Sequence, residues 1–329
     1  MASRAALVLG TVAVGTPACS FLVQVLPWWR WNSWFYGVLV LAGGSVIGLG
    51  CWFARRRNTT LALIVGPAFT AVVLILDQLM GAHLQLSAPL GDNPIVAGRF
   101  HGMGNTDFAL MCTSVVLCAG IAAGALRRAG KQRLGLAVAG GLCLIAIVVD
   151  AAPTIGDDFG GLLAMGPAAA LLIALLAGMR LTWWRAVIAV LAAAALALGV
   201  ALIDYARPAD KQTHVGRFVG EVLHGGASGT LHRKFDASLL SFKNVALSCL
   251  VGIAIVVITA ARRQVAEVLR RVDGLIEAAI ALVVLAFLGT FLNDSGVVVG
   301  GTVLLLSLFA TAASGLITTG NDGTGGSPP

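Results

Sequence analysis

Charged residues are scarce in this sequence, which excludes an ordinary water-soluble domain. Lys, Arg, Asp and Glu make up 11% of the 329 residues, whereas hydrophobic residues make up 58%. A soluble domain carries about a quarter charged residues. Apolar runs of about 20 residues, the length that crosses a bilayer core as a helix, recur along the whole chain. The sequence therefore predicts an all-α, polytopic membrane protein.

The sequence also lacks the patterns of a metal, redox or nucleic-acid site. Its six cysteines form no CxxC pair, and no histidine lies at ligand spacing from them. We interpret the cysteines as small packing residues, and we expect neither a metal nor a cofactor. The net charge of +7 has no basic patch interleaved with aromatics. Nucleic acid is therefore not an expected partner.

Charge clusters and Pro/Gly breaks divide the chain into about ten predicted spans. They cover residues 5–26, 35–54, 59–80, 106–126, 134–152, 160–179, 183–203, 239–261, 275–292 and 297–318. We expect one helical domain over residues 1–318, a largest outer loop at 204–238 and a disordered cytoplasmic tail at 319–329. The N-terminal run starts like a signal peptide, but it stays apolar to Leu26, so we interpret it as a retained first span.

The distribution of charge predicts the orientation. With a cytoplasmic N-terminus, most Lys and Arg fall in short inner loops, which places both termini in the cytoplasm. Most acidic residues and all five histidines then face outward. Because the inner face carries little but anchoring cations, a functional site is expected on the outer face. The outward acidic residues are Asp77, Asp92, Asp107, Asp150, Asp157, Asp158, Asp204, Asp210, Glu221, Asp236 and Asp294.

The first outward segment contains GRFHGMGNTDFAL, residues 98–110. Its glycines permit close backbone approach to a ligand. Arg99, beside His101, carries a guanidinium suited to phosphate. Asn105 or Thr106 is expected to cap the following helix, with Asp107 in its first turn. These residues predict substrate binding by Arg99, His101, Asn105 and Asp107. The alternative is a structural turn in which Arg99 extends to lipid headgroups.

The second segment, DAAPTIGDDFGG, places Asp150, Asp157 and Asp158 within nine residues at a membrane boundary. Carboxylates this close repel one another, so at least one is expected to need a proton or a cationic partner. We interpret them as candidate catalytic residues. Capping of the next helix by Asp157 or Asp158 is the structural alternative.

The third segment is the loop at 204–238. VGRFVGEVL within it has the pattern of a short amphipathic helix on the membrane surface. His214 is a further candidate catalytic base, and Arg207 and Arg217 are candidate contacts for an anionic substrate. The alternative is a solvated loop attracted to anionic headgroups.

The stretches GRFHGMGN, DAAPTIGDDFGG and ARPADKQTHVGRF resemble a group of actinobacterial multi-pass membrane proteins, mostly uncharacterised. The resemblance covers nearly the whole chain and implies a multi-pass protein of a bacterial plasma membrane. In span number and in the place of its largest outer loop, the chain is also similar to SEDS glycosyltransferases. The arginine- and histidine-bearing loop resembles that of O-antigen ligases and polymerases. These likenesses concern architecture and assign no catalytic residue.

Three hypotheses follow. The first is a glycosyltransferase-like polymerase or ligase acting on a polyprenyl-pyrophosphate-linked substrate in cell-envelope assembly. The second is a transporter or flippase for an anionic or lipid-linked solute, and the third is a non-catalytic scaffold of an envelope complex. The expected partners are membrane lipids, a lipid-linked glycan and other envelope proteins. The transferase hypothesis predicts that the three outer segments converge, whereas a polar path through the membrane centre would favour transport.

Overall fold

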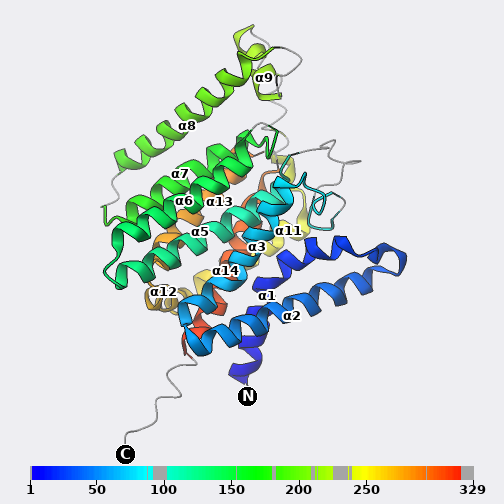
Figure 1. Ribbon diagram of the computed structural model, residues 1–329, viewed down its shortest axis with the longest axis vertical. Helices are drawn as coiled ribbons and strands as arrows, with labels where there is room; N and C mark the ends of the chain where they lie inside the picture. The colour runs from blue at the N-terminus through cyan, green and yellow to red at the C-terminus, as the bar shows by residue number, and fades with distance from the viewer. Residues whose placement is uncertain are drawn as a thin grey trace, which may run out of the picture.

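The protein folds as a bundle of long helices (Figure 1). The computed structural model describes residues 2–86, 88–91, 102–152, 154–179, 183–208, 214–224, 239–293 and 295–319, and the single residues 212 and 236. Within these residues every regular element is a helix, as the composition predicts.

The helices follow the predicted apolar runs closely. Their bounds are α1 Ala2–Leu22, α2 Ser33–Arg57, α3 Thr59–Leu79, α5 Asn105–Arg128, α6 Gln132–Ala151, α7 Phe159–Leu176, α8 Trp183–Tyr205, α9 His214–Leu223, α11 Val245–Ala260, α12 Arg262–Arg271, α13 Leu275–Leu292 and α14 Val297–Thr319. Two short 3-10 helices, Val23–Val25 and Trp28–Arg30, join α1 to α2.

Seven of the described helices are long and apolar enough to cross a membrane: α2, α3, α5, α6, α7, α13 and α14. The pair α11 and α12 gives an eighth candidate if it counts as one span. The protein is therefore a multi-pass membrane protein. The predicted first and seventh spans are helical as well, as α1 and α8. The total of ten spans stays a prediction, as does the orientation of the termini.

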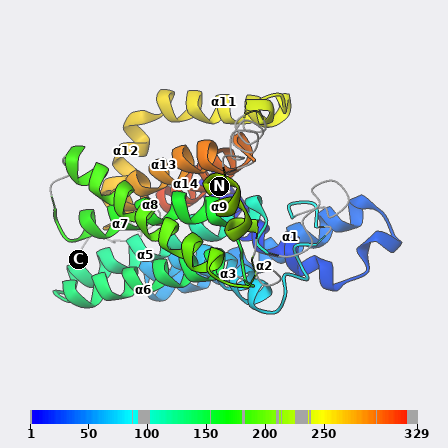
Figure 2. The ribbon, with the colours of Figure 1, turned by 90° about the horizontal axis from the view of Figure 1, so that it is seen from above.

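Helix α5 lies at the centre of the bundle (Figures 1 and 2). Of its most apolar 18-residue stretch, 83% is buried, against 22% for α2 at the edge. Helices α3, α6, α7, α13 and α14 pack around it. Its buried side chains include Phe108, Met111 and Val116, which are 0% exposed. The other helices therefore leave α5 little contact with lipid.

Glycines allow α5 to cross the start of α13 at backbone contact. A methyl group on Gly120 would lie 2.7 Å from the carbonyl oxygen of Gly274, and one on Gly124 would overlap the backbone of Asp273. Gly274 itself has a left-handed backbone, with φ of +83°. Small residues at such crossings bring helix backbones close together in membranes.

Two ion pairs lie beside this crossing. The Arg127 guanidinium is 2.8 Å from the Glu277 carboxylate, and that of Arg128 is 2.5 Å from the Asp273 carboxylate. Both pairs are partly exposed to the surroundings, so each adds little stability by itself.

The two ends of the bundle differ in charge. At the basic end lie the α2–α3 turn, the α5–α6 turn and α12, with their arginines and lysines (Figure 1). At the opposite end, which we call the acidic end, α3, α6 and α13 finish and α5, α7 and α14 begin. Every buried charged side chain among the described residues is an aspartate: Asp77, Asp107, Asp150, Asp157, Asp158 and Asp204. All six lie where helices start or finish towards the acidic end.

Candidate functional site at the acidic end

Four turns at the acidic end are joined by hydrogen bonds. The Gln78 side chain at the end of α3 donates to the carbonyl of Ile155, at 2.5 Å. The Met103 amide donates to the carbonyl of Gly156, at 2.8 Å. The first and second predicted segments are therefore in direct contact, as the hypothesis of a shared outer site requires. The fourth turn, between α13 and α14, is joined to the others through the side chains of Asn293 and Ser295.

Gln85 connects the end of α3 to the start of α5. Its side-chain amide donates to the Asp77 carboxylate (3.1 Å) and to the side-chain oxygen Oε1 of Gln78 (3.0 Å). The side-chain oxygen Oε1 of Gln85 accepts from the Gly104 backbone amide (3.3 Å). Gln85 is 2% exposed. Because a buried amide bonded on both sides is costly to move, these contacts fix the turns in one arrangement.

Asp150, on the last turn of α6, is completely buried. Its carboxylate lies against Gly161 of α7, where a methyl group would overlap the carboxylate and lie 2.8 Å from the Phe108 ring. Its carbonyl oxygen accepts from the Asp158 amide, at 3.0 Å. Glycine at 161 thus makes room for a carboxyl group among α5, α6 and α7.

Asp158 immediately precedes α7, but it does not cap that helix through its side chain. Instead its carboxylate accepts from the Asn293 side-chain amide, at 3.2 Å, and Asn293 is 2% exposed. Asp158 therefore does not have the capping role that the structural alternative gave it. Its carboxylate ties the α6–α7 turn to the end of α13.

The start of α5 differs from the prediction in one respect. The cap residue is Gly104, not Asn105 or Thr106, and no side chain caps the helix. Asn105 is the first helical residue, and its side-chain amide donates to the Ser295 hydroxyl in the α13–α14 turn. Asp107, one turn in, is 0% exposed. The helix begins one residue earlier than predicted because Gly104 has the extended backbone of a cap residue, and the Asn105 side chain is engaged by Ser295.

Strained backbone is concentrated at this end. Among the described residues, the non-glycine residues with positive φ are Ala82 (59°), Thr154 (75°) and Asp157 (51°). Ala82 follows α3, and the other two lie in the α6–α7 turn. A β-branched residue such as Thr154 rarely adopts this conformation. Such strain, held by surrounding contacts, is typical of functional sites.

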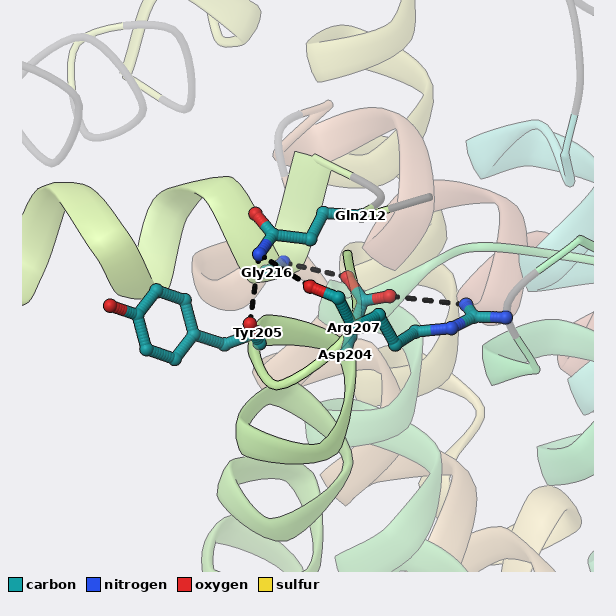
Figure 3. Close-up of polar contacts among 5 residues, drawn as sticks. All are labelled: Asp204, Tyr205, Arg207, Gln212 and Gly216. Carbon is teal, nitrogen blue, oxygen red and sulfur yellow. Dashed lines mark hydrogen bonds and ion pairs between the residues drawn. The ribbon is translucent and has the colours of Figure 1, made fainter. Parts of the chain in front are cut away.

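The third predicted segment forms a separate polar unit with α8 (Figure 3). VGRFVGEVL is helical, as predicted, within α9. The buried Asp204 carboxylate accepts from the Gly216 amide of α9 (2.8 Å) and pairs with Arg207 (3.3 Å). The Gln212 amide donates to the carbonyls of Tyr205 and Arg207. Asp204 therefore caps α9 from another helix.

We expect Asp204→Ala to loosen α9 without unfolding the bundle. A lost helix cap costs about 0.5–2 kcal/mol. In hydrogen-exchange mass spectrometry, residues 214–224 should therefore exchange about tenfold faster. Leu223→Ala, on an exposed position of the same helix, is the control and should change exchange little. Unaltered protection of α9 in the Asp204 variant would contradict the capping role.

The other predicted site residues lie in different parts of the chain. Arg99 and His101 lie outside the described residues, and so does the side chain of His214 in α9. Arg217 is exposed on α9. Just beyond the third segment, the Ser241 hydroxyl accepts from the Val297 amide at the start of α14, at 2.9 Å. Within the described residues, direct contact between the predicted segments is therefore seen only for the first two. The structure thus brings together, at the acidic end, Asp150, Asp157, Asp158, Asn105 and Asp107. Arg207 and Arg217 lie on the separate α8–α9 unit.

Sequence reasoning missed Gln78, Gln85, Asn293 and Ser295. They lie at or just beyond the end of an apolar run, where a lone amide or hydroxyl resembles an ordinary boundary residue. The available signal was their position, since all four lie beside predicted outward turns.

Two further features concern the surroundings of the site. The described residues contain no group of three or more His, Cys, Asp or Glu side chains that could hold a metal ion. An apolar crevice lies between α1, α3, α5 and α14, lined by residues such as Val14, Pro67, Leu117 and Ala313. It lies nearer the basic end than the aspartates, and its lining fits hydrocarbon better than a polar substrate.

Comparisons with protein-family models, with curated proteins and with solved structures gave no match for this chain.

Proposed function

We propose that this membrane protein is a glycosyltransferase-like polymerase or ligase with its active site at the acidic end. The donor would be a glycan linked to polyprenyl pyrophosphate, used on the outer face of a bacterial plasma membrane in envelope assembly. The observation that carries the proposal is the placement of Asp150 and Asp158 at the two ends of one strained turn, which buried polar contacts tie to three other turns.

The arrangement fits general base catalysis. Transfer to an acceptor hydroxyl needs a carboxylate that takes up the hydroxyl proton. The acceptor oxygen then bonds to the anomeric carbon as the bond from that carbon to the phosphate oxygen breaks. Polyprenyl pyrophosphate leaves with the electron pair, and the base later returns its proton to solvent. Asp150 is our candidate base, with Asp157 and Asp158 beside it and His214 as a further candidate.

The cationic candidates fit the leaving group. Arginine forks bind phosphate oxygens in pairs, so Arg99, Arg207 and Arg217 are candidate pyrophosphate contacts. Arg207 already pairs with Asp204, whereas Arg217 is exposed on α9. His101, Asn105 and Asp107 would contribute to sugar or phosphate binding in the first segment.

The interior of the bundle argues against the transport alternative. Between the two ends, the described core consists of residues such as Met111, Val115, Ala146, Met165 and Leu285. The polar side chains buried among them are small, as in Thr70 and Thr113. Ion-coupled carriers place ionisable groups near the membrane midplane. In the described residues the buried charges lie at the acidic end instead.

The proposal is tested with purified protein reconstituted in liposomes. A radiolabelled oligosaccharide on polyprenyl pyrophosphate is supplied with an unlabelled acceptor. The expected result is release of polyprenyl pyrophosphate together with a lengthened glycan. Movement of labelled lipid between leaflets without release would support transport, and neither event would support the scaffold alternative; either result would overturn the proposal.

Arg217→Ala should weaken donor binding in the same assay. We expect KM for the donor to rise about tenfold because the arginine contacts the pyrophosphate of the bound donor, and kcat to fall as well because the charge on that group grows as it leaves. Lys243→Ala, which removes an exposed cation near the start of α11, is the matched control. An unchanged KM in the Arg217 variant would remove this residue from the site.

A further inference from the structure

Helix α12 lies across the basic end of the bundle (Figure 1). The chain bends by 78° between α11 and α12, at Ala261. The predicted eighth span ends at this bend, and no helix was predicted after it. The ten residues of α12, RRQVAEVLRR, carry four arginines and one glutamate.

The two sides of α12 have different surroundings. Val268 contacts α14, where a methyl group on Gly315 would lie 2.8 Å from it, and Leu269 packs against the core. Arg262, Arg263, Arg270 and Arg271 are all exposed. Val268 and Leu269 follow Val265 by three and four positions, the spacing of a helix that lies with one apolar side on a surface. The apolar side is therefore already used by the bundle, and the charged side faces outward.

The arginines of α12 differ from other arginines at the basic end in their ion-pair partners. Arg127 and Arg128 have carboxylate partners on or beside α13. Arg271 pairs with Glu267, at 2.6 Å, within α12 itself. Within the described part of the chain, no carboxylate pairs with Arg262, Arg263 or Arg270. Three exposed guanidinium groups thus remain available on one short helix.

The neighbouring residues indicate a lipid as the partner. Val256 and Val257, in the last turns of α11, are 66% and 45% exposed on a helix in the membrane. Arg262 and Arg263 follow within two turns of the helix, beyond the bend. That position corresponds to the headgroup layer next to the hydrocarbon that the valines contact. Arginine forks bind phosphate in pairs, and each cation near an anionic leaflet contributes to binding.

We propose that α12 binds the phosphate groups of anionic phospholipids through Arg262, Arg263 and Arg270. The bound leaflet is the one at the basic end, which the orientation predicts to be the inner one. The contact holds the ends of α11 and α14 at the membrane surface. It is independent of the acidic end and of any reaction there.

The test uses full-length protein in nanodiscs of phosphatidylcholine, with or without phosphatidylglycerol. Phosphatidylglycerol should raise the Tm of the wild-type protein and should remain bound in native mass spectrometry. The triple variant Arg262→Gln, Arg263→Gln, Arg270→Gln should lose most of the rise in Tm and bind this lipid about tenfold more weakly. The triple variant Arg57→Gln, Lys131→Gln, Arg133→Gln removes the same charge at the same end and should behave like the wild type.

Equal losses in the two triple variants would overturn the proposal, because the lipid would then sense only net charge. The proposal would also be overturned if the α12 triple variant kept the full rise in Tm that phosphatidylglycerol causes. If the α12 triple variant cannot be purified, the single variants Arg262→Gln, Arg263→Gln and Arg270→Gln are compared with Arg133→Gln in the same way. Added salt should reduce the effect in the wild-type protein.

Discussion

Asp150→Asn is expected to lower kcat by about 100- to 10,000-fold, the usual contribution of a general base. Asparagine has nearly the same shape, so it fits against Gly161 and Phe108, but it cannot take up a proton at neutral pH. The variant should therefore fold and bind donor while losing the chemical step. Release of polyprenyl pyrophosphate by the purified proteins measures the effect.

The pH profile separates catalysis from structure. Activity of the wild-type protein should fall at acidic pH as the base becomes protonated. The residual activity of the Asp150 variant should lack that acidic limb, which a purely structural defect would preserve. Asp273→Asn, the same substitution at the basic end, is the control and should retain activity. Wild-type kcat in the Asp150 variant would exclude this residue as the base and direct attention to Asp157, Asp158 and His214.

Gly124→Ala is expected to disrupt the centre of the bundle. The new methyl overlaps the carbonyl of Asp273, which is backbone and cannot rotate away. Helices α5 and α13 must then separate, which also strains the two ion pairs beside the crossing. Overpacking of this kind costs about 1–3 kcal/mol and sometimes more. The Tm and the yield of monodisperse protein measure the loss.

Two other glycines provide controls for the crossing. A methyl group on Gly140, in the middle of α6, meets nothing within 4 Å, so Gly140→Ala should leave the Tm unchanged or raise it slightly. Gly130 has open space but a φ of +74°, so Gly130→Ala reports backbone strain alone, about 1–2 kcal/mol. If Gly124→Ala is no more damaging than Gly140→Ala, the close crossing is wrong.

The helices were predictable because the length of an apolar run is a local property of the sequence. Each of the ten predicted spans coincides with a helix within a few residues, except that the eighth begins later, at Val245. Helix α12 was not predicted because spans were recognised by the length of their apolar runs, and α12 is mostly charged. Its spacing of Val265, Val268 and Leu269 was the signal that could have found it.

The site was predictable only in part. Short-range crowding singled out Asp150, Asp157 and Asp158, and the bond from Met103 to Gly156 brings the start of α5 beside them. The partners of these residues come from α3 and α13, far away in the sequence, and no local pattern reveals such contacts. Gln85 and Asn293 therefore emerged only from the packing.

The crossing of α5 and α13 has a consequence for how the protein is made. Arg127 and Glu277 are 150 residues apart, so α5 is synthesised long before the helix that covers its glycine face. Until the ribosome has delivered α13, the centre of the bundle lacks one of its walls. Nascent chains that stop before Leu275 should therefore be inserted yet incompletely assembled, and membrane quality-control proteases should remove them faster than chains that extend through α14.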